Sequence, residues 1–187
     1  MENQVMTTYI ALLKGINVGG KNIIKMAELK QHLSKIGLNN VRTYIQSGNV
    51  IFESEKAAAI LRDELEKEIE KQFGFQVPVF LRTLEEMKRL VAQSPFSKEK
   101  VEKAQAGKEA EVFYVSFFNT PPSEAEIQHL SSVKAENEYF EIIGKDIYLL
   151  FNDSIRFSKL ATTLLRLKTM NTVRNGKTVN KLILLSS

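Results

Sequence analysis

The sequence predicts an α+β protein made of two consecutive β-α-β-β-α-β repeats, each followed by a trailing helix. Short apolar, β-branched segments alternate with segments whose apolar residues recur every three or four positions, the spacing of a helix face. The capping boxes Thr83-x-x-Glu86 and Ser123-x-x-Glu126 mark two helix starts. The second half repeats the order of elements of the first, and that order is the ferredoxin-like split β-α-β arrangement.

The first half, residues 1–93, contains one complete repeat. Strands are expected over 8–14, 41–45, 50–52 and 77–81, helices over 26–36 and 57–73, and a trailing helix from Thr83. Proline lacks the N–H that a central strand donates, so Pro78 predicts that strand 77–81 lies at a sheet edge. The first half is therefore expected to fold as a sheet with helices between its strands.

The charged segment 94–111 is the predicted linker, and residues 112–187 form the second half. Strands are expected over 112–118, 139–143, 147–151 and near 172–173, and helices from Ser123, over 158–168 and around Val179 to Ile183.

The two halves differ in one loop. Residues 15–25 separate the first strand from its helix, whereas residues 119–122 do so in the second half. Such loops usually take about 2–6 residues, and longer ones are often functional.

Composition excludes several classes of protein. The 187 residues include no cysteine, which excludes disulfides and thiolate chemistry, and His32 and His129 are too few for a multi-histidine metal site. The longest apolar segments, such as 112–118, are far shorter than the roughly 20 residues of a membrane span. No basic residue precedes Lys14, so no secretory signal is expected. We expect a cytoplasmic protein without a membrane partner.

The first long loop is expected to meet the turn after the second strand, because those two strands point the same way. The candidate ligand-binding residues there are Asn17, Gly19, Gly20, Lys21, Asn22, Gln46, Ser47 and Asn49. They combine amide and hydroxyl groups with a lysine and no carboxylate, which favours a small anionic ligand such as a nucleotide or a phosphorylated metabolite. The alternative is a structural loop whose polar side chains bond to their own backbone.

The pattern Gly15-x-x-x-x-Gly20-Lys21-Asn22 differs by one residue from a phosphate-binding P-loop. Asn22 stands where that motif needs a Ser or Thr hydroxyl to hold Mg²⁺, and the helix is expected only from Met26. The sequence therefore does not favour a P-loop nucleoside triphosphatase.

A second candidate anion site lies in the basic C-terminal segment. The net charge of the chain is +4, yet residues 152–187 hold seven Lys or Arg and one acidic residue, Asp153. Asn175 is placed to cap the last helix, whose free N–H groups, with Arg174 and Lys177 beside them, would suit a phosphate or carboxylate. Arg174 and Lys177 are expected to close the first site if the C-terminal segment folds over it. The alternative is a solvated basic face.

Two other function classes stay open. A single-stranded nucleic-acid-binding module would stack bases on aromatic strand residues. The candidates are Tyr44, Phe52, Phe113, Tyr148 and Phe151. A protein–protein adaptor without a ligand is the third class. Glu126 with His129 is only half of a di-metal carboxylate motif, so no metal ligand is predicted. The sequence also indicates no general base, nucleophile or cofactor. No reaction, catalytic residue or oligomeric state is assigned.

The segments YIALLKGINVGGKN (9–22), TYIQSGNVIF (43–52) and RNGKTVNKL (174–182) resemble a bacterial family, domain-of-unknown-function family 1697. The resemblance spans nearly the whole chain and implies ferredoxin-like repeats, but it implies no function. Many members of that family have tryptophan after the Arg-Asn pair, where this chain has Gly176. Any ligand contact made by that tryptophan is expected to be missing here.

Overall fold

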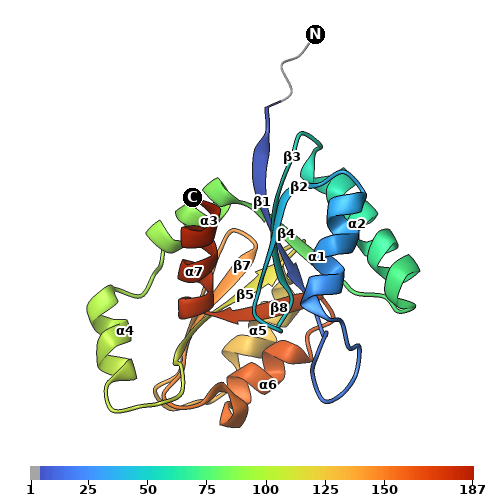
Figure 1. Ribbon diagram of the computed structural model, residues 1–187. Helices are drawn as coiled ribbons and strands as arrows, with labels where there is room; N and C mark the ends of the chain where they lie inside the picture. The colour runs from blue at the N-terminus through green and yellow to red at the C-terminus, as the bar shows by residue number, and fades with distance from the viewer. Residues whose placement is uncertain (1–4) are drawn as a thin grey trace. The chain divides into compact units, whose positions relative to one another are not determined.

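The computed structural model describes residues 5–187, which form two four-stranded antiparallel sheets and seven α-helices (Figure 1). The predicted α+β class is confirmed. The chain divides into two compact units. Unit 1 comprises the chain up to Leu90 together with Asn180–Ser187, and unit 2 comprises Val91–Val179. Each unit contains one of the two sheets.

The sheet of unit 1 has the strand order β2-β3-β1-β4. Its elements are β1 (Thr7–Leu13), α1 (Met26–Lys35), β2 (Asn39–Tyr44), β3 (Asn49–Ser54), α2 (Ala58–Phe73), β4 (Val79–Thr83) and α3 (Leu84–Ala92). β4 lies at an edge of this sheet, as Pro78 predicts, although the strand begins after the proline rather than at Val77. In this unit, the long loop 15–25 comes after β1, and the turn 45–48 joins β2 to β3.

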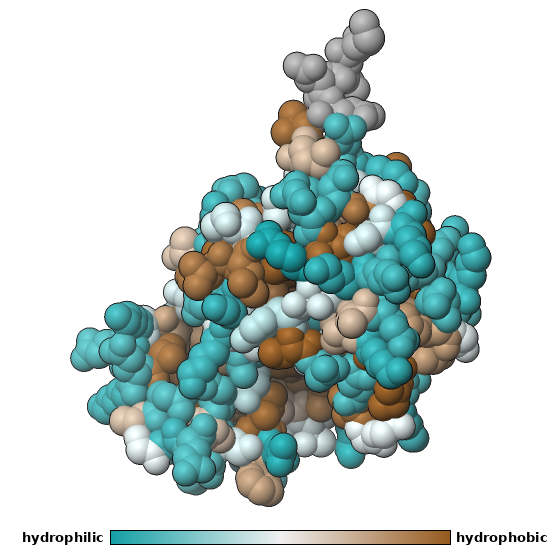
Figure 2. All heavy atoms as spheres, in the orientation of Figure 1, coloured by the Kyte–Doolittle hydropathy of each residue, from teal (hydrophilic) through white to brown (hydrophobic). Residues whose placement is uncertain are grey.

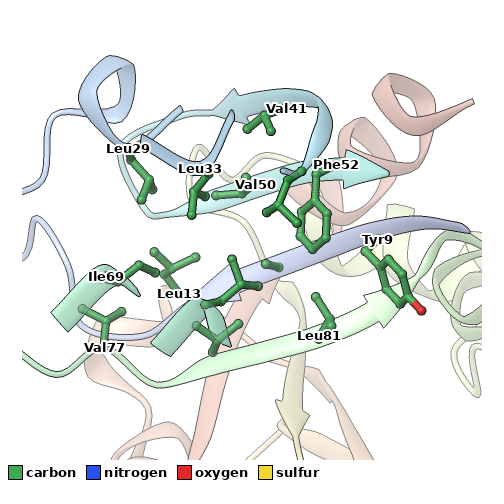
Figure 3. Packing of buried hydrophobic residues seen from close by; sticks show 14 of the residues in the cluster. Tyr9, Leu13, Leu29, Leu33, Val41, Val50, Phe52, Ile69, Val77 and Leu81 are labelled. Atoms are coloured by element: carbon green, nitrogen blue, oxygen red, sulfur yellow. The ribbon is translucent and has the colours of Figure 1, made fainter. Parts of the chain in front are cut away.

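One face of this sheet packs against α1 and α2 (Figure 3). Alternate residues of β1, namely Tyr9, Ala11 and Leu13, belong to the buried core cluster, as the period of two in a strand requires. The helices contribute residues three or four positions apart, such as Leu29 and Leu33 of α1. The helix-spaced residues of the sequence therefore identify this core correctly.

The sheet of unit 2 has the strand order β6-β7-β5-β8. Its elements are α4 (Lys98–Gln105), β5 (Phe113–Phe118), α5 (Glu124–Ser131), β6 (Tyr139–Ile143), β7 (Asp146–Leu150), the 3-10 helix η1 (Ile155–Phe157), α6 (Lys159–Leu165) and β8 (Asn171–Asn175). α7 (Gly176–Ser186) follows β8, and its residues from Asn180 onward are grouped with unit 1.

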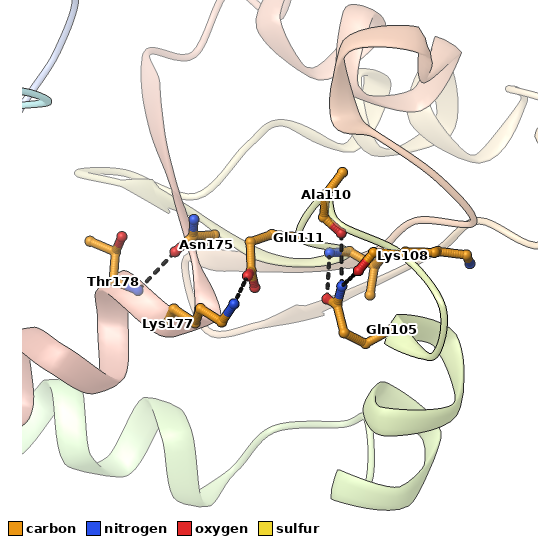
Figure 4. Close-up of polar contacts among 8 residues, drawn as sticks. Gln105, Lys108, Ala110, Glu111, Asn175, Lys177 and Thr178 are labelled. Atoms are coloured by element: carbon orange, nitrogen blue, oxygen red, sulfur yellow. Dashed lines mark hydrogen bonds and ion pairs between the residues drawn. The ribbon is translucent and has the colours of Figure 1, made fainter.

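The predicted linker, residues 94–111, contains α4 and is tied to unit 2. The Gln105 side-chain amide donates to the carbonyl oxygens of Lys108 (3.0 Å) and Ala110 (2.9 Å) and accepts from the Val112 N–H (Figure 4). The Phe96 ring packs edge-on against Phe113 of β5, with ring centroids 6.3 Å apart. These contacts explain why the segment belongs to unit 2 rather than standing apart as a linker.

Both predicted capping boxes form. Thr83 Oγ1 accepts from the Glu86 N–H at 3.1 Å, and the Glu86 carboxylate accepts from the Thr83 N–H at 2.8 Å. At α5, Ser123 and Glu126 make the same reciprocal pair. The Glu126 carboxylate also accepts from both the N–H and the hydroxyl of Thr169, each at 2.8 Å. Glu126 therefore joins the start of α5 to the segment before β8.

These hydrogen bonds lower the pKa of Glu126 to about 2, with the Thr169 N–H as the largest cause and the Ser123 N–H and the two hydroxyls adding to it. Partial burial acts in the opposite direction and is outweighed. The sequence predicts the capping role of Glu126, but the Thr169 contact joins residues 43 positions apart and has no sequence signature.

Hydrophilic side chains cover most of the face shown in Figure 2, with hydrophobic residues in separate patches between them. Among the described residues, no helix combines the length and apolar character that crossing a membrane requires.

Candidate functional site

The long loop of unit 1 folds into a small hairpin. The Asn17 N–H donates to the Asn22 carbonyl and the Lys21 N–H to the Val18 carbonyl, each at 3.1 Å. Gly19 and Gly20 occupy the two central positions of this turn with φ of 59° and 73°. Positive φ at both positions is the signature of a type I′ turn, which favours glycine. Nothing lies within 4 Å of a Cβ built on either glycine, so the backbone conformation, not close packing, calls for them.

Asn17 fixes this hairpin to the rest of unit 1. Its Nδ2 donates to the carbonyl oxygens of Ile24 (3.0 Å) and Gln46 (2.9 Å), and its Oδ1 accepts from the Ile24 N–H (2.8 Å). Asn22 Nδ2 donates to the Gly15 carbonyl at 3.1 Å. Both asparagines have positive φ, which asparagine tolerates better than most residues. Their side chains thus have a structural role, the alternative that the sequence left open.

The turn between β2 and β3 packs directly against the start of this loop. The Leu13 N–H donates to the Gly48 carbonyl at 2.8 Å. A Cβ on Gly48 would lie 2.7 Å from Ile16 Cδ1 and 2.8 Å from Leu13 Cβ, and Gly48 has a φ of 81°. Here glycine is required both by the backbone conformation and by the close approach of the loop.

Asn49 is fully buried and holds the same turn together. Its Nδ2 donates to the Tyr44 carbonyl at 2.9 Å and to Ser47 Oγ at 3.1 Å. Ile45 has a φ of 50°, an uncommon conformation for a β-branched side chain. Gln46 and Ser47 are exposed. The predicted loop and turn residues of unit 1 therefore lie together. The side chains of Asn17, Asn22 and Asn49, however, bond to the loop and the turn themselves.

The exposed tip of the hairpin is basic and partly apolar. Residues 14–25 contain Lys14, Lys21 and Lys25 and no acidic residue. Lys21 is exposed, and Lys25 pairs with Glu28 at 3.1 Å. Partial burial lowers the pKa of Lys14. Lys14 is not among the site residues predicted from the sequence, although its place at the end of a buried strand, directly before the long loop, is a signal for it.

Large apolar side chains share this end of unit 1. Val18 and Ile23 of the hairpin are 67% and 60% exposed, and Ile45 of the turn is 47% exposed. Isolated exposed apolar residues are common, and these three belong to one loop and the turn bonded to it.

The three predicted C-terminal site residues belong to unit 2 and have partners there. Arg174 of β8 is buried, and its Nη1 donates to Thr172 Oγ1 (3.0 Å) and to the Val173 carbonyl (2.9 Å). Burial lowers the pKa of Arg174 to about 10. The Arg174 guanidinium is therefore buried on its strand, and its role in closing the site stays a prediction.

Asn175 caps α7 as predicted, because its Oδ1 accepts from the Thr178 N–H at 2.8 Å (Figure 4). Lys177 pairs with Glu111 at 2.5 Å. A Cβ on Gly176 would lie 2.6 Å from Phe113 Cδ1, so the Phe113 ring fills the space where a larger residue at this position would begin.

Three of the five aromatic rings predicted to stack on nucleic-acid bases are buried, whereas Tyr44 and Phe113 are partly exposed. Phe52 and Phe151 are fully buried in the cores of their units, and Tyr148 is 2% exposed. Since bases stack on exposed aromatic faces, these three rings are unavailable for that contact. Their β-strand positions predicted aromatic side chains on a sheet but not which face carries them.

The two histidines make no metal site. His32 Nε2 lies 3.4 Å from the Glu68 carboxylate of α2, and His129 is exposed on α5. Over residues 5–187, no cluster of three or more His, Cys, Asp or Glu side chains is arranged to hold a metal ion.

Comparisons with known proteins identify a family and a similar solved structure. A family model described as "Protein of unknown function (DUF1697)" matches residues 6–148. The fold is similar to that of a conserved bacterial protein, SP0830, from Streptococcus pneumoniae, with a TM-score of 0.78 and 29% sequence identity. That match covers 98% of this chain and 100% of the other. The comparison with curated proteins gives no match.

Proposed function

The chain belongs to the DUF1697 family of proteins of unknown function, and we propose that it binds a small anionic ligand at the hairpin tip of unit 1. The observation that carries the proposal is that a rigidly held type I′ turn presents Lys21 and two glycine N–H groups to solvent. In the described chain, neither the Gly19 N–H nor the Gly20 N–H donates to another group. A nucleotide or a phosphorylated metabolite has the charge and the acceptor oxygens that these donors require.

The contacts available for orienting the ligand differ from those expected. Asn17, Asn22 and Asn49 serve the loop and the turn, so ligand contact falls to Lys21, the Gly19 and Gly20 amides, and the exposed Gln46 and Ser47. Lys14 adds positive potential at the base of the loop. The preformed loop lowers the entropy cost of binding, because its backbone is already fixed by hydrogen bonds.

The test is a thermal-shift screen of nucleotides and phosphorylated metabolites on the full chain. A ligand at about 100 times its dissociation constant adds roughly 2.7 kcal/mol of stability. We expect a hit to be lost in Lys21→Ala and kept in Lys30→Ala, an exposed lysine on α1 that serves as the matched control. A hit that survives Lys21→Ala, or no hit across the panel, would contradict the proposal.

A second candidate function is a protein–protein adaptor, favoured by the exposed Val18 and Ile23 of the loop and Ile45 of the turn bonded to it. If the protein is an adaptor, Val18→Asp should disrupt capture of a partner protein, whereas Lys21→Ala should not. Under the anion proposal, Lys21→Ala carries the effect instead. Co-purification from a cell extract with each variant separates the two functions.

We also infer that each sheet with its two intervening helices is a ferredoxin-like repeat. The strand orders β2-β3-β1-β4 and β6-β7-β5-β8 are equivalent position by position, and each repeat has the connection order β-α-β-β-α-β. The expected location of the protein stays the cytoplasm, as inferred from the sequence.

A further inference from the structure

In unit 2, the side-chain ammonium group of Lys100 lies in a pocket lined by aromatic rings. The ammonium nitrogen of Lys100 on α4 lies 4.1 Å from the centroid of the Tyr139 ring and 5.1 Å from that of Phe96. A cation within about 6 Å of a ring face is attracted by the negative potential of that face. The two rings come from segments about 40 residues apart in the chain, so the tertiary fold of unit 2 assembles this arrangement.

Carboxylates line the same pocket. The cavity measures about 290 Å³, and its lining includes Phe96, Lys100, Glu138, Tyr139, Phe140 and Glu141. Phe96 is 5% exposed and packs edge-on against Phe113, which fixes the orientation of its ring. The Ser158 hydroxyl donates to Glu138 Oε2 at 2.7 Å and so positions that carboxylate. Aromatic faces together with anionic oxygens match the chemistry of an organic ammonium ion.

The Lys100 side chain is only weakly held in this pocket. α4 buries none of its residues, and Lys100 itself is exposed. A cation–π contact at an exposed site contributes little, and a flexible lysine side chain loses rotamer freedom to keep it. The Lys100 side chain can therefore leave without disturbing a core.

From the rings, the carboxylates and the displaceable lysine, we infer that this pocket binds small organic ammonium ions. Lys100 occupies the cation position until a ligand replaces it. Quaternary ammonium groups suit such a site best, because aromatic faces replace their weak hydration at little cost. This site is independent of the hairpin tip in unit 1, because every residue that forms it belongs to unit 2.

The experiment titrates choline into the full chain and follows the trimethyl resonance by ligand-observed NMR. The uncharged isostere 3,3-dimethyl-1-butanol is titrated in parallel, because it has the same shape without the charge. We expect choline to bind and the isostere not to bind. Removing the competing cation in Lys100→Gln should tighten choline binding about two- to fivefold, whereas Lys103→Gln on the same helix should leave it unchanged.

Substitution of Tyr139 gives a second test, in which choline binding should weaken rather than tighten. Tyr139→Leu should weaken choline binding by about five- to thirtyfold, and Tyr139→Phe should retain it, because phenylalanine keeps the aromatic face. Tyr139 is 45% exposed, so both variants are expected to fold, which a thermal melt checks. Equal binding of choline and its isostere, no choline binding by Lys100→Gln, or unchanged binding by Tyr139→Leu would each overturn the inference.

Discussion

The Asn17 side chain donates to the backbone carbonyl of Gln46 at 2.9 Å, and this bond joins the loop after β1 to the turn after β2. The same amide also holds both backbone groups of Ile24, so one side chain sets the position of the whole hairpin. Its importance can be measured.

Asn17→Ala should lower the free energy of unfolding by about 1–3 kcal/mol, because three hydrogen bonds are lost and alanine disfavours positive φ. Urea denaturation measures the change. Asn17→Gly separates the two causes, since glycine keeps the conformation and loses only the bonds. Equal stability of Asn17→Ala and the unmodified protein would show that the loop is not held by this side chain.

Gly19→Asn should be nearly neutral, whereas Gly19→Val should cost about 1–2 kcal/mol. The site has a φ of 59° and open space around it, so only the backbone preference of the new residue matters. Asparagine followed by glycine is a favoured type I′ pair. Thermal unfolding of the two variants is the measurement, and equal losses would argue against the type I′ assignment.

Gly48→Ala and Gly74→Ala form a matched pair, because both glycines have a φ of 81°. A Cβ on Gly48 meets Ile16 and Leu13 at under 3.0 Å, whereas nothing lies within 4 Å of a Cβ on Gly74. We expect Gly74→Ala to cost about 1 kcal/mol and Gly48→Ala about 1–3 kcal/mol more. Chemical denaturation of both variants isolates the packing contribution, and equal costs would refute it.

Glu126→Gln should alter the acid stability of the protein. The pKa of Glu126 is lowered from 4.5 to about 2 by its hydrogen bonds to Thr169 and Ser123, so folding is favoured when the carboxylate is ionised. That stabilisation is fully present above about pH 4.5 and is lost as the pH falls toward 2. After allowance for solvent screening, we expect a loss of about 1 kcal/mol at pH 7.

A pH series provides the control for the Glu126→Gln experiment. The stability difference between the unmodified protein and Glu126→Gln should shrink between pH 4.5 and pH 2, as measured by urea midpoints. A difference that stays constant over this range would mean that the ionised carboxylate contributes nothing beyond its shape.

Most elements could be predicted from the sequence because burial follows a simple period. Leu29 and Leu33 mark α1, and Thr83 and Ser123 mark helix starts by local hydrogen bonds. α4 was missed because it buries no residue and so has no apolar stripe, although Ser97 caps it. Its attachment to unit 2 depends on Gln105, whose amide gives no signal in the sequence.

The candidate site was predictable in location but not in detail. Strand direction places loop 15–25 beside Gln46, which the structure shows. The uses of Asn17 and Asn22 depend on positive φ values that a sequence pattern does not reveal. The burial of Arg174 depends on which face of β8 it occupies, and a one-residue shift in register would reverse that face.

The division of the chain into units has a consequence for biosynthesis. All of unit 2 is synthesised before the last eight residues of unit 1, Asn180–Ser187, are added. Domains generally fold as units during translation. The N-terminal sheet therefore emerges first, yet the unit to which it belongs is completed last, after the segment interposed within it.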